Sequence, residues 1–200
     1  MNIFRLDNIQ LRNNKGIKIK IKIKTNLLIG TLLASQLAFA NVENGGFENW
    51  SSSIPDDWST IDSGISLSKN TSFVKSGNSA TAVTVNTSTQ SSTDFRQGVS
   101  VTSGETYNYS VWVYHTEGNI QTRLYVNGYQ GYSNASITGQ WQVLTYSFTA
   151  SSTTSISVGL RFYDDSGFDG SEIVYVDDLE PNNGSGGGQV QAIAVHVHLV

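Results

Sequence analysis

The sequence predicts an all-β fold, of the β-sandwich or jelly-roll type. Short runs rich in Val, Ile, Tyr, Phe and Thr are separated by segments rich in Ser, Thr, Asn and Gly, the composition of strands joined by turns. The runs recur at about every dozen residues, which is typical of sandwiches and jelly rolls. Long stretches with the 3.6-residue apolar period of a helix do not occur after residue 40. Eight strands are expected, near Ile65–Ser68, Ala80–Val85, Asp94–Val101, Tyr107–His115, Gln121–Val126, Trp141–Thr149, Ile156–Tyr163 and Ile173–Leu179.

Residues 1–40 have the charge pattern of a secretory signal peptide. Of the chain's 12 lysines and arginines, 7 lie here, ahead of the apolar run Leu27–Ala40. A basic segment, a short apolar run and an A-x-A site, here Ala38-Phe39-Ala40, are the parts of such a peptide. The apolar run is shorter than the roughly 20 residues of a membrane-spanning helix. We therefore expect cleavage after Ala40, a secreted or periplasmic protein, and no membrane attachment afterwards.

The remainder of the chain predicts one domain and a short tail. Residues 41–181 are long enough to bury a core, and residues 182–200 begin as a Gly-rich linker. Because a linker usually joins two modules, we expect either a short irregular tail after the domain or an N-terminal module of a longer protein. The alternation of Ile and Lys over Ile17–Lys24 has the period of a strand, but we assign it to the leader and exclude it from the fold.

The charge after leader removal is strongly negative. Five basic residues remain against 15 acidic ones, since only Asp7 is lost, and 5 minus 15 is a net charge of −10. Such a surface repels phosphate backbones, so we expect no nucleic-acid partner for this domain. The chain has no cysteine, so an exported fold must be held by its core, to which a divalent metal bound by the abundant acids could add. We expect a monomer.

Strand periodicity separates the residues that face the core from those that face away from it. In Tyr107–His115, the residues Tyr107, Tyr109, Val111 and Val113 are expected to face the core. The outward positions of four expected strands carry rings and guanidinium groups, Arg96 among them. The candidate carbohydrate-binding residues are Trp112, Tyr114, Arg123, Tyr125, Arg161 and Tyr163.

These residue types suit a sugar ligand. Rings stack on the C–H faces of pyranoses, and arginine donates hydrogen bonds to hydroxyl groups or pairs with the carboxylates of acidic sugars. The alternative is that the same side chains only stabilise a solvated sheet through cross-strand contacts. The sequence does not assign the strands to sheets, so it leaves open which of these residues share a surface.

No catalytic residues are expected. The sequence has no G-x-S-x-G, no Cys nucleophile and no H-E-x-x-H. The adjacent carboxylates Asp56-Asp57 and Asp164-Asp165 lie in turn-like segments. This position indicates solvated loop residues and not the paired acids of a glycosidase. We therefore expect a protein that is not an enzyme.

Four segments of the sequence form a recognisable set. They are Val42–Trp50 (VENGGFENW), Pro55–Trp58 (PDDW), Val74–Ala80 (VKSGNSA) and Val174–Leu179 (VYVDDL). With these segments, the chain resembles the calcium-bearing jelly-roll carbohydrate-binding modules found beside bacterial xylanases and glucanases. The resemblance covers residues 42–181 and implies a jelly-roll β-sandwich of two antiparallel sheets, with glycan bound on a concave sheet face.

The same resemblance implies a structural Ca²⁺ that joins the opening and closing strands. Carried over by position, Gly46 supplies a backbone carbonyl, and Glu48 and Asp177 supply carboxylates. Oxygen ligands from distant parts of the chain suit Ca²⁺ and would hold the ends of a disulfide-free domain together.

The sequence thus predicts a secreted, non-catalytic carbohydrate-binding module that holds polysaccharide by aromatic stacking and hydrogen bonding. The alternative is an accessory or adhesion domain of a truncated secreted hydrolase, such as an extracellular nuclease. The identity of the glycan does not follow from the sequence.

Overall fold

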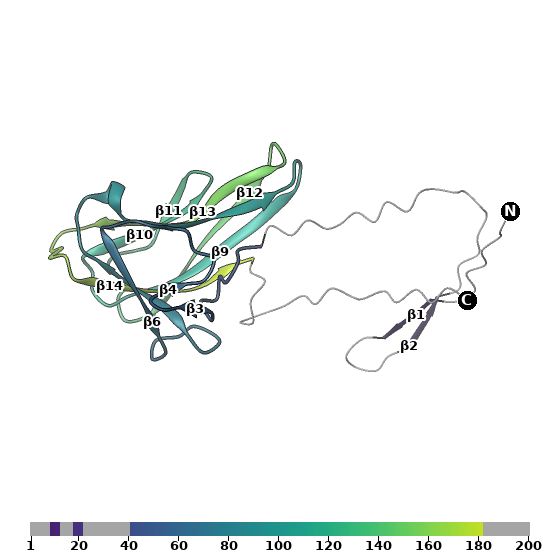
Figure 1. The fold of residues 1–200 in the computed structure, drawn as a ribbon, viewed down its shortest axis with the longest axis horizontal. Helices are drawn as coiled ribbons and strands as arrows, with labels where there is room; N and C mark the ends of the chain where they lie inside the picture. The colour runs from purple at the N-terminus through teal and green to yellow at the C-terminus, as the bar shows by residue number, and fades with distance from the viewer. Residues whose placement is uncertain (1–8, 13–17, 22–40, 182–200) are drawn as a thin grey trace. The chain divides into compact units, whose positions relative to one another are not determined.

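Residues 41–181 form a sandwich of two five-stranded antiparallel sheets (Figure 1). The structure is a computed structural model that describes residues 9–12, 18–21 and 41–181. The first sheet has the strand order β11-β10-β13-β8-β5, and the second has the order β12-β9-β14-β7-β6. This arrangement confirms the predicted fold class.

The strands of the two sheets have the following bounds. The first sheet consists of β5 (Thr60–Ile61), β8 (Asp94–Val101), β10 (Ile120–Val126), β11 (Tyr129–Tyr132) and β13 (Thr154–Asp164). The second sheet consists of β6 (Ile65–Asn70), β7 (Ala80–Val85), β9 (Thr106–His115), β12 (Trp141–Thr149) and β14 (Glu172–Glu180). Outside the two sheets, residues 41–181 contain the short pair β3 (Trp50–Ser51) and β4 (Ile54–Pro55) and one 3₁₀ turn, η1 (Gln90–Ser92).

All eight predicted strands are present, and the bounds of β7, β8 and β12 coincide with the prediction. The strand β11 was not predicted. It has only four residues, includes Gly131, and follows the turn at Asn127-Gly128. Its pairing with β10 also contains a register shift, so neither its composition nor its length marks it as a strand.

Successive strands mostly lie in opposite sheets. The strands β7 and β9 lie in the second sheet, whereas β8 and β10 lie in the first. The same alternation recurs in β12, β13 and β14, of which only β13 lies in the first sheet. Each outer face is therefore assembled from strands that are far apart in the sequence.

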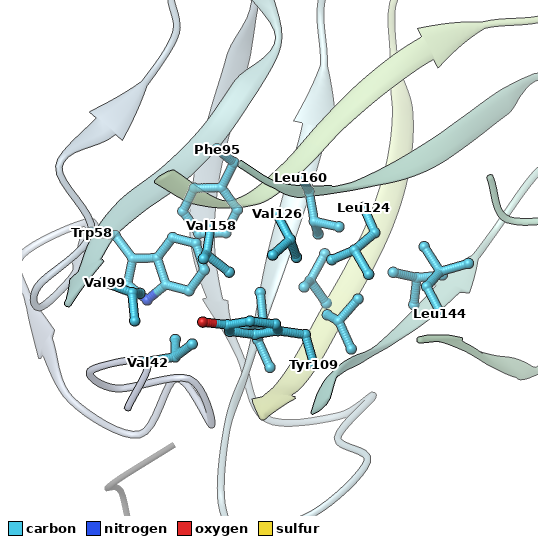
Figure 2. Close-up of a cluster of buried hydrophobic side chains, with 14 of the residues drawn as sticks. Val42, Trp58, Phe95, Val99, Tyr109, Leu124, Val126, Leu144, Val158 and Leu160 are labelled. Atoms are coloured by element: carbon cyan, nitrogen blue, oxygen red, sulfur yellow. The ribbon is translucent and has the colours of Figure 1, made fainter. Parts of the chain in front are cut away.

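The core lies between the two sheets (Figure 2). Phe95, Leu124 and Leu160 of the first sheet point toward Tyr109 and Leu144 of the second. The prediction for β9 is confirmed, because all four of its expected inward residues are buried. Burial of these apolar side chains is the main stabilising contribution in a chain without disulfides.

The two pieces of the predicted leader that the structure describes form a separate antiparallel pair. The strand β1 (Ile9–Arg12) pairs with β2 (Lys18–Ile21). Part of the alternating Ile and Lys segment, Lys18–Ile21, is thus a strand, and it belongs to neither sheet of the sandwich. The predicted cleavage site and residues 182–200 lie outside the described residues. Within the described part of the chain, no helix has the length and apolar character to cross a bilayer.

Candidate functional site

The outer face of the first sheet carries a cluster of arginine and tyrosine side chains. Leu124 in β10 and Leu160 in β13 are fully buried, so the residues on either side of them point away from the core. We call this cluster the arginine–tyrosine face. It consists of Arg96, Arg123, Tyr125, Tyr129, Tyr132, Arg161 and Tyr163.

A glycine at the centre of this face lets two of its side chains meet. Tyr125, Gly159 and Arg96 are register partners on the adjacent strands β10, β13 and β8. Because Gly159 places no side chain between its neighbours, the Arg96 guanidinium lies over the Tyr125 ring, 3.5 Å from its centroid. Such a cation–π contact holds both groups in one orientation.

A single carboxylate binds two of the arginines. Arg161 donates to Asp94 through Nε, at 2.5 Å from Oδ1, and through Nη2, at 2.7 Å from Oδ2. Arg96 Nη2 donates to the same Oδ1 at 2.5 Å. The hydrogen bonds from Arg161 to Asp94 raise the pKa of that guanidinium further above its ordinary value. Arg161 is thus a cation under all ordinary conditions.

The third arginine of the face is surrounded by rings. The Arg123 guanidinium lies 4.4 Å from the centroid of Tyr132, 5.0 Å from that of Tyr129 and 5.9 Å from that of Tyr163. Its Nε donates to the carbonyl oxygen of Gln130 at 2.8 Å. Among the residues that the structure describes, no carboxylate forms an ion pair with it.

Two of the predicted sugar-binding residues lie on the opposite side of the sandwich. Trp112 and Tyr114 point outward from β9 in the second sheet, since Val111 and Val113 are buried. The segment 73–79 lies against this face. Phe73 stacks on Tyr175, with 4.7 Å between ring centroids, and the Lys75 Nζ lies 4.3 Å from the centroid of Trp112.

The six candidate residues therefore divide between two surfaces. Arg123, Tyr125, Arg161 and Tyr163 share the arginine–tyrosine face, whereas Trp112 and Tyr114 do not belong to it. One saccharide ring cannot contact both sets, because the core lies between them.

Three members of the face, Arg96, Tyr129 and Tyr132, were not among the six candidate residues, and neither was Asp94, which binds two of its arginines. Tyr129 and Tyr132 lie on the missed strand β11, and their side chains are 38% and 44% exposed. Asp94 was treated only as the start of its strand. The one signal for the tyrosines was their position after the Asn127-Gly128 turn, which is typical of a hairpin.

The residues predicted to bind calcium lie at the second sheet. The Asp177 carboxylate is fully buried and accepts hydrogen bonds from the backbone N–H groups of Lys75, at 2.8 Å, and Ser76, at 3.2 Å. The Glu48 carboxylate accepts one from the N–H of Asn78, at 2.8 Å. Both carboxylates thus bind the segment 73–79, although they are 129 positions apart in the sequence.

A further carboxylate, not predicted, stands beside them. Asp178 Oδ1 accepts a hydrogen bond from Ser76 Oγ at 2.8 Å and would lie 3.8 Å from a Cβ built on Gly46. Burial raises the pKa of Asp177 to about 7, and the nearby charge of Asp178 adds to the effect. Burial also raises the pKa of Asp178, with a contribution from the Glu48 charge.

These residues fit a hard cation. Buried carboxylates whose pKa is raised by desolvation and by one another would be stabilised by a positive charge. Within the described ranges, no three Asp, Glu, His or Cys side chains gather closely enough to hold a metal ion by themselves. A cation here would therefore also need backbone oxygens, of which the carbonyl of Gly46 is the predicted one.

Similarity to one solved structure supports the fold. The chain is similar to TmCBM61, solved in complex with beta-1,4-galactotriose, with a TM-score of 0.50 and 17% identity over 70% of this chain and 96% of that chain. It is also similar to the CBM22-1 xylan-binding domain from Paenibacillus barcinonensis Xyn10C (TM-score 0.43, 14% identity, 68% and 88% covered). The C-terminal family 22 carbohydrate binding module of Clostridium thermocellum Xyn10B gives a TM-score of 0.43 at 18% identity, with 68% and 91% covered.

The family is shown by the sequence match. A comparison with curated proteins finds no match. Residues 40–166, however, match the family described as "Carbohydrate binding domain". The resemblance to carbohydrate-binding modules is thereby confirmed, while its calcium stays a prediction. Because the match covers more than half of the 200 residues, the chain belongs to this family of carbohydrate-binding domains.

Proposed function

We propose that the chain is an exported, monomeric, non-catalytic module that binds polysaccharide on the arginine–tyrosine face, by aromatic stacking and hydrogen bonding. The observation that carries this proposal is the meeting of three guanidinium groups and four tyrosine rings on one outer face. Rings bind the C–H faces of sugars, and the planar donors of arginine bind their hydroxyl groups.

The opposite face is a weaker candidate because the chain itself covers part of it. The Trp112 ring is in contact with Lys75, and Tyr175 is 9% exposed beneath Phe73. On the arginine–tyrosine face, by contrast, Tyr129 and Tyr132 are exposed.

Replacement of the exposed rings should weaken polysaccharide binding. The double variant Tyr129→Ala/Tyr132→Ala loses two stacking surfaces, each worth about 0.5–1.5 kcal/mol, so affinity should fall by about 5- to 150-fold. Affinity electrophoresis against a panel of neutral and acidic polysaccharides measures the change. The matched control is Phe73→Ala, which removes a ring of similar exposure, 43%, from the other side of the sandwich and should leave retention unchanged.

Variants of Trp112 and Tyr114 test whether polysaccharide binds on the second sheet instead. If Trp112→Ala or Tyr114→Ala abolished retention while the double variant still bound polysaccharide, the site would lie on the second sheet. If no polysaccharide retarded the wild-type protein, the proposal would be wrong.

We also propose that Gly46, Glu48 and Asp177 hold a structural Ca²⁺. Its support is the convergence of the buried Asp177 carboxylate and the half-buried Glu48 carboxylate, from the two ends of the domain, on one segment. A cation bound only by the native state stabilises it, by about 2.7 kcal/mol at 100 times the Kd.

Chelation should therefore lower the melting temperature by several degrees, measured by calorimetry with and without added Ca²⁺. Asp177→Asn should remove the response to Ca²⁺, because it removes a charged ligand. Asp165→Asn, at an exposed loop position, should keep the response. A melting temperature that did not change on chelation would eliminate the calcium site.

A further inference from the structure

We infer that the arginine–tyrosine face is specific for acidic polysaccharides, and that Arg123 pairs with the carboxylate of a uronic acid residue. This inference rests on the proposed function, because it names the class of glycan that the same face would bind. It depends on the charge balance of the face, the strand register, and the unsatisfied donors of one arginine.

The face is positively charged within an acidic domain. Residues 41–181 contain 5 basic and 15 acidic side chains, yet 3 of the 5 basic ones are Arg96, Arg123 and Arg161. At the outward positions of β8, β10, β11 and β13, the described strands offer one carboxylate, that of Asp94. The Asp62 carboxylate, directly after the edge strand β5, lies next to Asp94 and accepts a hydrogen bond from the Asp94 N–H at 2.8 Å. Counting both acids, the three guanidinium groups leave an excess of one positive charge.

Two of these positive charges stand directly opposite each other. Arg123 and Arg161 are register partners on the adjacent strands β10 and β13. Like charges in such positions destabilise a sheet. Asp94 is the register partner of Arg161 on the other neighbouring strand, β8. Its negative charge therefore lies on the side of Arg161 that is away from Arg123. A ligand carboxylate beside Arg123 would reduce the repulsion between the two guanidinium groups, whereas a neutral hydroxyl group would not.

Arg123 has N–H donors that no described residue accepts. Its Nε is used by the Gln130 carbonyl, but among the described residues no acceptor binds its two terminal nitrogens. The rings of Tyr129, Tyr132 and Tyr163 surround the guanidinium group, and its terminal nitrogens keep their N–H donors for a ligand. A planar fork of this kind matches a carboxylate through two parallel N–H···O bonds. The fork can also pair with a tetrahedral oxyanion, so sulfated polymers are measured beside the uronates.

The test compares polymers that differ only in their carboxylates. We would measure retention of the wild-type protein by polygalacturonate, alginate and glucuronoxylan, and by the carboxyl-reduced form of each, at about 0.15 M salt, where distant charges are screened. At least one parent polymer should bind at least about tenfold more tightly than its reduced form. Raising the salt concentration should weaken the binding of the parent polymer more than that of the reduced form.

Two variants connect the preference to the arginine. Arg123→Gln should remove the preference for the parent polymer and leave any binding of the reduced form. Arg123→Lys keeps the charge without the planar fork and should restore only part of the preference. The matched control is Lys69→Gln, which removes a positive charge from β6 in the second sheet and should change neither measurement. Melting temperatures of all variants show whether each one is folded.

Four results would overturn the inference. If the reduced polymers or a neutral polysaccharide bound as tightly as the parents, the acidic specificity would be wrong while the proposed function stood. If Arg123→Gln were folded and kept the preference, the assignment to Arg123 would be wrong. Retention by sulfated polymers but by no uronate would reject the carboxylate. Retention by no polysaccharide at all would reject both the inference and the proposed function.

Discussion

Gly159→Ala should destabilise the domain more than any other single methyl group added to the first sheet. A Cβ at Gly159 would lie 2.1 Å from the carbonyl oxygen of Phe95 and 2.7 Å from the Cα of Arg96. Both are backbone atoms of β8, which pairs with β13 at this point, so neither can move without opening the ladder. Overpacking a rigid site costs about 1–3 kcal/mol and occasionally more. We expect a loss of at least about 3 kcal/mol, or failure to fold.

The matched control is Gly131→Ala on the edge strand β11. A Cβ there would meet no atom within 4 Å, so the variant should melt within a few degrees of the wild-type protein. Urea unfolding monitored by circular dichroism compares the three proteins. If Gly159→Ala and Gly131→Ala had equal stability, the close contact between β8 and β13 would be wrong.

Asp94→Ala should also cost stability, through the charges that it leaves behind. Arg96 and Arg161 both donate to this carboxylate, and Arg96 and Asp94 are each only 9% exposed. Removing one partner of a buried ion pair costs about 3–5 kcal/mol, because a buried charge remains without compensation. Since these side chains keep some contact with solvent, we expect about 2–3 kcal/mol.

Asp94→Ala should also weaken polysaccharide binding. Without the carboxylate, the guanidinium groups of Arg96 and Arg161 lose their common anchor, so polysaccharide binding should weaken even in the folded variant. Glu105→Ala is the control, because Glu105 is exposed and belongs to neither outer face. Equal stabilities of Asp94→Ala and Glu105→Ala in urea would contradict the structural role of Asp94.

Much of the fold followed from local pattern. Alternation of inward and outward residues placed Val111 in the core and Trp112 outside it, and the bounds of β8 were predicted without error. The candidate site was predicted less completely. Tyr129 and Tyr132 were missed because a four-residue strand with a register shift carries too few residues to show a period.

What the sequence by itself determined is the side of its own strand on which each residue lies. The side-chain period of two is a local property of extended backbone, so it needs no partner strand. Only the tertiary structure decided which strands share a sheet, because that choice depends on packing between segments far apart in the chain. Tyr114 and Tyr125 look equivalent in sequence, yet β9 and β10 lie in opposite sheets, and so the two rings belong to different surfaces.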